Sequence, residues 1–192
     1  SVTIEDAHTN ITEIVCNGKV VFKATRKKNI RNMTSEKPPH IHRYTLRQLM
    51  NYVDRVPISE IAFIRHAHDL NLALFQEALK SSKATITDYL CSQNHQQVIS
   101  AAEQKTASLL CNGAIEARVL GLSKPAMSIT GSGAHGIIAT LPLYASSQVN
   151  NYGEEELLRA TALSYLVCMY IKEYSGKLSA FCGCAIAAGT GM

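Results

Sequence analysis

The fold class of this chain is decided by residues 57–80, PISEIAFIRHAHDLNLALFQEALK. Apolar side chains recur there every three or four positions and fall on one face of a helix: Ile61, Ile64, Ala67, Leu70, Leu74 and Leu79. Before it, Thr45 can cap a helix that Pro57 ends. His66 and His68 fall on different helix faces, so they do not form an i, i+4 metal pair. The stretch therefore predicts a mainly helical domain.

Helical patterns continue toward the end of the sequence. We expect one helix over 95–120, ending at Gly121, and another running from a glycine cluster at 131–136 to about Ser147. Three glutamates at 154–156 precede an apolar helix over 157–171, where acids suit the positive end of the helix dipole. Gly176 ends that helix, and a last helix is expected over 178–192.

The first 24 residues have strand character, with candidate strands at 2–4, 11–15 and 20–22. Asn17-Gly18 between the last two favours a tight hairpin turn, because both residue types tolerate positive φ. The polar, basic stretch 25–43 has neither the strand nor the helix period, and we interpret it as a linker. The sequence predicts an α+β, mainly α fold: a small antiparallel β-hairpin segment with linker, 1–43, and a helical domain, 44–192.

Composition narrows the functional classes. The 192 residues are 46% hydrophobic and 18% charged, which is typical of an ordered globular chain. A net charge of +4, scattered lysines and arginines and the absence of Trp argue against a nucleic-acid surface. No stretch predicts a membrane span or a secretion signal, so we expect a cytoplasmic protein.

The six cysteines follow no disulfide-like spacing. Four of them have apolar neighbours or lie beside a turn, which predicts buried small side chains: Cys16, Cys91, Cys111 and Cys168. The remaining two form the Cys182-Gly183-Cys184 pair, expected within the last helix. That helix ends on Gly191-Met192 without a polar cap, and the chain begins without Met, so we expect an internal fragment truncated at its C-terminus.

Two places could carry chemistry. The turn Gly131-Ser132-Gly133-Ala134-His135-Gly136 leads into a helix, where backbone N–H groups suit a carboxylate or phosphate, although it matches neither nucleotide-binding glycine pattern. The alternative is a tight turn between closely packed helices. The thiols of Cys182 and Cys184 suit iron or zinc, with two buried thiols as the alternative.

Taken together, AMSITGSGAHGIIATLPL at 126–143 and GKLSAFCGCAIAAG at 176–189 resemble the bacterial serine dehydratase alpha-chain family that includes L-cysteine desulfidase. The segment 8–11, before the Asn-Gly hairpin, is also similar, so the resemblance covers nearly the whole chain. It implies the middle of a protein roughly twice as long, in keeping with two or more domains of ordinary size.

The resemblance implies an iron-sulfur-dependent amino-acid lyase that converts L-cysteine to pyruvate, sulfide and ammonia, or L-serine to pyruvate and ammonia. A [4Fe-4S] cluster would take Cys184 or Cys182 as one ligand and further cysteines from outside this chain. The substrate carboxylate would lie at Ser132, Gly133, His135 and Gly136.

We expect an Asn-Gln pair in the family's turn where this chain has Ala134-His135, so His135 would replace the amide donor or carry a proton. The catalytic base stays unassigned.

Two other functions fit the residues. One is a non-catalytic relative that serves as a small-molecule-binding module or scaffold, with Cys182 and Cys184 buried. The other is a zinc-binding domain with ligands from His40, His42 or His66. Expected partners are a small amino-acid substrate and a second copy of the chain in a homo-oligomer, without nucleic acid or membrane. We expect no cluster and no turnover in this chain by itself.

Overall fold

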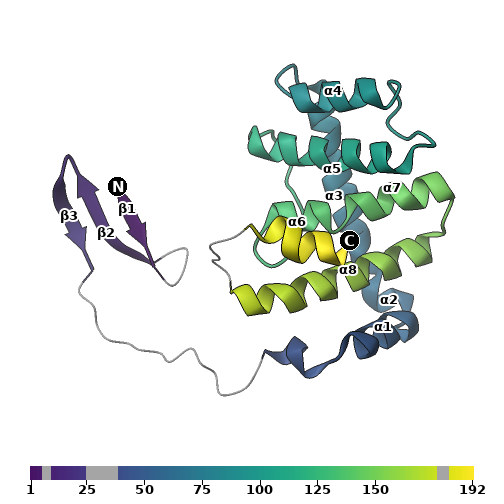
Figure 1. Ribbon diagram of the computed structural model, residues 1–192, viewed down its shortest axis with the longest axis horizontal. Coiled ribbons are helices and arrows are strands. Elements are labelled where there is room, and N and C mark those ends of the chain that lie inside the picture. Colours follow the sequence, from purple (N-terminus) through teal and green to yellow (C-terminus); the bar gives the residue numbers. More distant parts are fainter. Residues whose placement is uncertain (6–9, 25–38, 177–181) are drawn as a thin grey trace.

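The computed structural model describes residues 1–5, 10–24, 39–176 and 182–192. Most of these residues are helical, and the strands among them form one antiparallel sheet, which confirms the α+β, mainly α fold class. In Figure 1 the sheet lies to one side of the helices. The division at residues 43 and 44 stays a prediction, and most of the predicted linker, 25–38, lies outside the described residues.

The sheet has the order β1 (Val2–Ile4), β2 (Ile11–Cys16), β3 (Lys19–Lys23). Asn17 and Gly18 have φ of 49° and 76°, so the predicted hairpin turn is confirmed. Cys16 is exposed at the end of β2, so its predicted burial is wrong: none of the described residues packs over that end of the sheet.

The first helices follow Pro39. The 3₁₀ turn η1 (His40–Arg43) occupies the end of the predicted linker, which was expected to be irregular. Helix α1 (Leu46–Arg55) begins at Thr45, whose side chain accepts from the Gln48 backbone N–H while the Gln48 side chain accepts from the Thr45 N–H. The predicted cap is therefore present.

The stretch that decides the fold class forms three segments rather than one helix: α2 (Ile58–Ile61), the 3₁₀ turn η2 (Ala62–Ile64) and α3 (Arg65–Lys80). Four of the predicted face residues are buried: Ile61, Ile64, Ala67 and Leu74. Ala78 is buried in place of Leu79, which is 37% exposed. Ala78 is four residues after Leu74 and Leu79 is five, so the 3.6-residue period of α3 itself places Ala78 on the buried face.

The helix predicted over 95–120 is wrong in its first third. Helix α4 (Thr85–Gln93) ends before residue 95, and α5 begins only at Glu103 (Glu103–Val119). His95 and Gln96 have positive φ, while the buried Asn94 side chain donates to the Gln97 carbonyl and accepts from the Ser100 hydroxyl. An asparagine that bonds its own turn in this way competes with the helix.

After the glycine cluster two helices replace the single one that was predicted, α6 (Gly133–Ile138) and α7 (Leu141–Asn150). The break lies at Thr140, directly before the first turn of α7 with its Pro142. Helix α8 (Glu154–Ser175) has its three acids in the first turn and Gly176, with φ 70°, after its end, as predicted.

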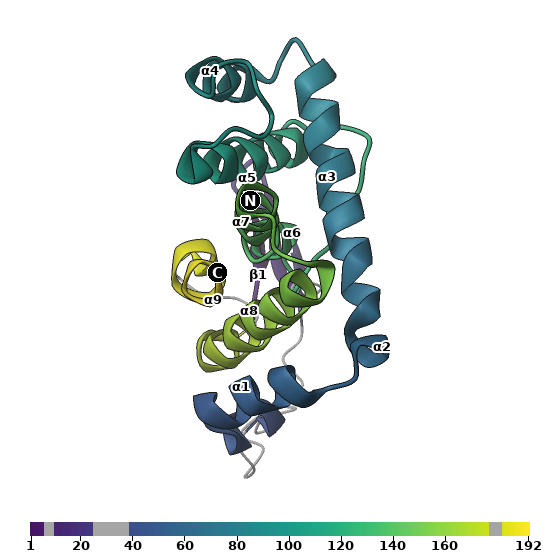
Figure 2. The same cartoon turned by 90° about the vertical axis from the view of Figure 1, so that its right-hand side faces the viewer.

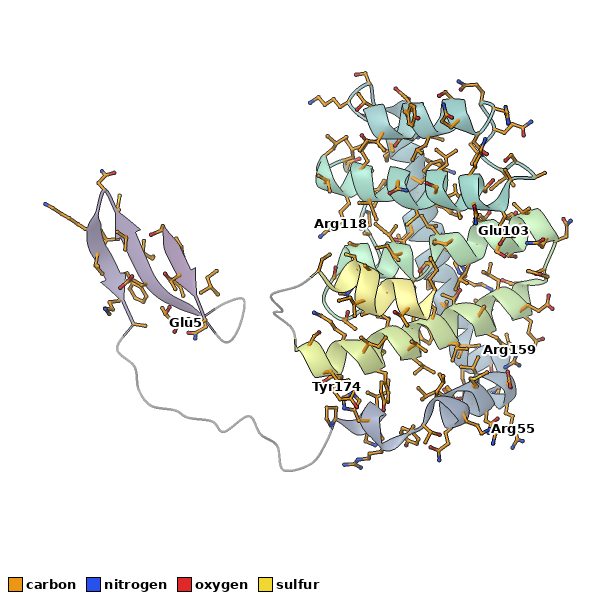
Figure 3. The ribbon with its side chains drawn as sticks, in the orientation of Figure 1. Glu5, Arg55, Glu103, Arg118, Arg159 and Tyr174 are labelled. Carbon is orange, nitrogen blue, oxygen red and sulfur yellow. The ribbon has the colours of Figure 1, made fainter. Side chains whose placement is uncertain are left out.

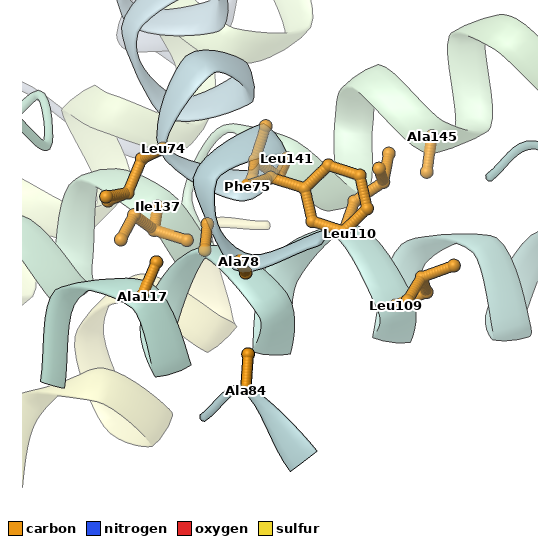
Figure 4. Close-up of a cluster of buried hydrophobic side chains, with 11 residues drawn as sticks. Leu74, Phe75, Ala78, Ala84, Leu109, Leu110, Ala117, Ile137, Leu141 and Ala145 are labelled. Atoms are coloured by element: carbon orange, nitrogen blue, oxygen red, sulfur yellow. The ribbon is translucent and has the colours of Figure 1, made fainter. Parts of the chain in front are cut away.

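Figure 2 shows α3 running along one side of a stack that contains α4, α5, α7 and α8. The main core lies between α3, α5 and the α6–α7 segment, and Figure 4 shows its buried side chains, among them Leu74, Phe75, Leu110 and Leu141. A second core joins α1 and α2 to α8 through residues such as Val53, Ile61 and Leu158. A third cluster, in which Ile129 and Ile138 pack against Cys168 and Tyr165, holds α8 close to α6.

The last described segment packs on α8. It begins at Cys182 and continues as the π-helical turn η3 (Cys184–Ala188) and α9 (Gly189–Gly191), with Ala187 and Ala188 buried against Cys168 and Ile129. The last helix is thus shorter than predicted, and residues 177–181 lie outside the described residues. In the described part of the chain, no helix has the length and apolar character needed to cross a membrane.

Candidate functional site

The glycine turn forms a closed loop at the start of α6. Ile129 and Ser132 exchange two backbone hydrogen bonds, while Thr130 and Gly131 between them have φ of 54° and 79°. Ser132 caps α6, because its hydroxyl oxygen accepts from the His135 backbone N–H at 3.4 Å. The Ser132 hydroxyl proton is not used in this bond and can be donated.

Gly136 allows the turn to approach the segment before it. A Cβ at Gly136 would lie 1.9 Å from the Met127 carbonyl oxygen, so a larger residue does not fit. Its own N–H donates to the Ser132 carbonyl, and its carbonyl accepts from the Thr140 hydroxyl. The backbone of Gly136 is therefore already bonded within the turn, as are the backbones of Ser132 and His135.

A side chain from α3 holds the two arms of the turn together. Asn71 is fully buried, and its Oδ1 accepts from the Met127 N–H at 3.0 Å while its Nδ2 donates to the Gly136 carbonyl at 3.3 Å. A buried amide with both ends bonded fixes the positions of both partners. Asn71 shapes the turn from outside it.

His135 connects the glycine turn to the cysteine pair. Its side chain is 4% exposed, and Nδ1 lies 2.8 Å from the Thr130 hydroxyl. On the other side of the ring, a Cβ at Gly183 would lie 2.8 Å from Nε2, so the Cys182-Gly183-Cys184 segment rests directly on the imidazole. Two motifs separated by about fifty positions in the sequence thus meet at one ring.

Two cationic side chains lie at the same place. Lys172, near the end of α8, is buried and lowers the pKa of His135, although burial of the ring is the larger cause of that shift. Arg118 extends from the end of α5 toward α6, as Figure 3 shows, and its Nε lies 2.9 Å from where a Cβ of Gly133 would be. Positive charge therefore lies beside the first residues of the turn.

The two cysteine thiols differ in their surroundings. Cys182 is exposed and precedes η3, and hydrogen bonds from the Cys184 backbone N–H and side chain lower its pKa. Cys184 is half-buried in η3, and burial raises its pKa, with Cys182 as a further cause. Only Cys184 lies in a helix, whereas the sequence predicted both there. Helix irregularities of the η3 type occur often at functional sites.

Further thiols surround this junction. Cys168 of α8 is buried, which raises its pKa, and it shares a hydrogen bond with the Thr130 hydroxyl. Cys111 of α5 is also enclosed, and burial, with the nearby Cys184, raises its pKa to about 12. Within the residues that the structure describes, no three His, Cys, Asp or Glu side chains gather in a way that could hold a metal ion.

The histidines of the zinc hypothesis lie elsewhere. His42 stacks on Tyr174, with ring centroids 4.0 Å apart, and its Nε2 is 2.9 Å from the Tyr170 carbonyl. His66 is on the exposed side of α3. Neither belongs to a metal-binding group in the described residues, so the structure gives the zinc hypothesis no support.

The structure brings together the predicted residues Ser132, Gly133, His135, Cys182 and Cys184. Sequence reasoning missed four neighbours: Thr130 directly before the glycine cluster, and Cys168, Lys172 and Arg118, which come from other elements. Lys172 was interpreted only as a charge that suits the negative end of a helix, because it lies in the last turns of α8. Arg118 carried no signal that distinguishes it from a surface residue.

Comparison with known proteins gives consistent results. A family model described as serine dehydratase alpha chain matches residues 7–192. A UPF0597 protein of Clostridium botulinum (strain Langeland) is 38% identical over 191 residues, covering 96% of this chain and 43% of the relative. UPF0597 proteins of Clostridium tetani and Methanocella arvoryzae are 34% and 35% identical, each over 190 residues, covering 99% and 98% of this chain and 43% of each relative.

The chain therefore spans less than half the length of the curated relatives it matches. No solved structure matches it.

Proposed function

The chain belongs to the serine dehydratase alpha chain family, and from this membership we propose that it is part of a cytoplasmic, iron-sulfur-dependent lyase acting on L-cysteine or L-serine. The family supports lyase chemistry on amino acids in general. The observation that carries the finer proposal is the contact of the His135 ring with Gly183, because it joins a carboxylate-type turn to a thiol pair.

The turn and its two cations would bind the substrate carboxylate. Arg118 and Lys172 supply positive charge, and the Ser132 hydroxyl supplies a donor at the start of α6. Charge-assisted hydrogen bonds of this kind are the strong ones, and they would orient the α-carbon toward the cysteine segment. The absence of a side chain at Gly133 allows Arg118 to pack closely against the turn.

The reaction would be a β-elimination. The α C–H bond breaks, and its electron pair forms a double bond as the Cβ–S or Cβ–O bond breaks, releasing sulfide or water. The resulting aminoacrylate rearranges to an imine, which water hydrolyses to pyruvate and ammonia. Burial and Lys172 lower the pKa of His135, so its ring is neutral near pH 7 and able to accept a proton.

A [4Fe-4S] cluster would require three or four thiolates, and the described residues offer the adjacent pair Cys182 and Cys184. The lowered pKa of Cys182 suits a thiolate ligand, while Cys184 is the more enclosed of the two. The other ligands would come from outside the described residues. When bound, the cluster would supply a Lewis acid for the leaving hydroxyl or thiol.

The test is anaerobic iron-sulfur reconstitution of the full-length protein, followed by pyruvate release from L-cysteine and L-serine in parallel. Visible absorbance of a cluster with turnover would support the lyase and identify its substrate. C182A and C184A, assayed separately, would show which thiol is needed, and C91A, at a half-buried cysteine of α4, is the control. Intact protein that takes up no cluster would exclude this proposal and favour a small-molecule-binding scaffold.

We also propose that the protein works as a homo-oligomer. The exposed apolar side chains of the sheet, such as Val21 and Phe22, support association with another surface. Light scattering of the purified protein at several concentrations tests this directly, and a monomeric mass throughout would contradict it.

A further inference from the structure

A second pocket lies between α3, α7 and the start of α8, away from the glycine turn. Its volume is 280 Å³, and polar groups line it, including Arg65, His68, Asp69, Ser147 and Glu154. The α8 residue behind it, Thr161, is separated from Lys172 by about 16 Å of helix. The pocket is therefore distinct from the site proposed for the lyase reaction.

His68 is the buried group of this pocket, with 6% of its surface exposed. Its Nε2 lies 3.1 Å from the Thr161 hydroxyl oxygen. That hydroxyl donates its single proton to the Leu157 carbonyl at 2.8 Å, so it can only accept from His68. The imidazole therefore carries its proton on Nε2, which leaves Nδ1 as a hydrogen-bond acceptor.

Nδ1 of His68 has no hydrogen-bond partner among the described residues, and it is not sealed from solvent, since the described residues contain no fully buried side-chain nitrogen or oxygen without a partner. Burial lowers the pKa of His68 even though Asp69 and Glu154 act in the opposite direction, so the ring is neutral near pH 7. The unpartnered acceptor of a ring that is more than nine-tenths buried and lines a pocket is suited to a ligand that donates a hydrogen bond.

The charges around the pocket favour a positively charged ligand. Glu154 forms an ion pair with Arg65, whereas Asp69 has no cationic partner within the described part of the chain. The net charge of these three groups is negative. The Ser147 hydroxyl, which donates to the Tyr152 carbonyl, adds acceptor capacity, and the ring of Tyr144 lies near that of His68 at 6.1 Å between centroids.

We propose that this pocket binds a small primary amine, whose ammonium group donates to His68 Nδ1 and is neutralised by Asp69. An ammonium has three donors and one positive charge, which fits the acceptors and the charge of the pocket. The Tyr144 ring offers a face for the cation or for the carbon attached to it. This inference is independent of the lyase reaction.

The test is ¹⁵N NMR of the histidine rings while the protein is titrated with ethylammonium, and separately with propionate and with ethanol as probes of equal size. We expect a saturable shift of His68 Nδ1 with ethylammonium alone. D69N changes an exposed residue and should weaken ethylammonium binding about fivefold. H66Q, on the exposed side of the same helix, is the matched control and should bind as the unaltered protein does.

H68Q places an amide nitrogen near Nε2 and removes the Nδ1 acceptor. Because it also removes the ring whose signal is followed, its binding of ethylammonium is measured by titration calorimetry, and the heat of binding seen with the unaltered protein should be lost. If H68Q does not fold, the D69N and H66Q pair decides the question. No saturable shift with ethylammonium, an equal shift with propionate, or equal binding by D69N and the unaltered protein would each overturn the proposal. So would a His68 ring that carries its proton on Nδ1.

Discussion

Two buried histidines, His135 and His68, lie in different regions of the molecule. Their bonds to threonine are alike, but the surroundings of their second ring nitrogens differ. Each ring nitrogen nearest a threonine is within hydrogen-bond distance of its hydroxyl, Thr130 for one and Thr161 for the other. Burial lowers the pKa of both rings. The second nitrogen of His135 faces the Gly183 backbone, whereas that of His68 faces a pocket.

The difference lies in what the threonine hydroxyl does. Thr161 gives its proton to a carbonyl of its own helix, which fixes the proton on His68. Thr130 lies near the Ile129 carbonyl, His135 and Cys168, so its proton has three possible acceptors. The regular helix therefore fixes which ring nitrogen of His68 carries the proton. In the irregular turn, the position of the proton on His135 depends on its neighbours.

The largest expected effect is at Gly136, because the region of His135, unlike that of His68, depends on two backbone segments lying close together. We predict that G136A lowers the free energy of unfolding by about 3 kcal/mol or more, because its Cβ would meet the Met127 carbonyl oxygen. Urea denaturation measures this change. G153A is the control, because the added Cβ there meets only the Glu156 side chain at 3.6 Å and its cost should stay at about 1 kcal/mol, the usual penalty for alanine at the first position before a helix. Equal costs for both would contradict the clash.

The His135 ring and Gly183 should be coupled energetically. G183A forces a methyl group against the ring and should cost about 1–2 kcal/mol of unfolding free energy. In an H135A background the methyl group has space, so the same substitution should cost about 1 kcal/mol less. A double-mutant cycle from denaturation midpoints gives this difference. Additive effects of the two substitutions would mean that the ring does not support the cysteine segment.

The two threonines sharpen the comparison further. T161V removes the acceptor of a buried His68 N–H and should cost about 1–2 kcal/mol of unfolding free energy. T130V, at a half-buried residue of the turn, should cost less. Thermal unfolding of the two variants side by side tests the order. A larger loss in T130V would show that the turn, and not the helix, depends more on its histidine partner.

The smallest expected effect is on the pH dependence of stability. The folded pKa of His68 lies below the unfolded value of 6.5 because of burial, so the unfolded chain takes up the proton first as pH falls. Stability from this group is therefore present above about pH 6.5 and is lost below it, by at most about 1.4 kcal/mol per pH unit.

H68Q should remove the contribution of His68 to the change in unfolding free energy between pH 7 and 5. Urea denaturation at several pH values measures this change. H66Q should retain it, since its ring is exposed. An unchanged slope in H68Q would assign the acid sensitivity to other groups.

The local parts of the fold were predictable from the sequence. The Asn17-Gly18 hairpin, the Thr45 cap and the end of α8 at Gly176 depend on neighbouring residues, and each is confirmed. The helix predicted from residue 95 is wrong because Asn94 and Ser100 bond each other and interrupt it. Periodicity detects apolar faces, but it does not detect polar side chains that close a turn.

The site was predictable in its motifs and not in their arrangement. Gly131 to Gly136 and the cysteine pair are visible in sequence, but their contact through His135 depends on how η3 packs on α8. The buried position of Lys172 and the interaction of Asn71 with the turn depend likewise on tertiary packing. For His68, the sequence excludes an i, i+4 metal pair with His66, but the nitrogen that stays free follows only from the bond of Thr161 to Leu157.

The two close approaches of the turn constrain its evolution in different ways. The atom that opposes a side chain at 136 belongs to the backbone, so no substitution elsewhere in the chain can make room for it. The atoms that oppose a side chain at 183 belong to His135, which a smaller residue can replace. Related proteins should therefore all have glycine at position 136. Packing would allow positions 135 and 183 to change together, provided that the histidine is replaced before the glycine.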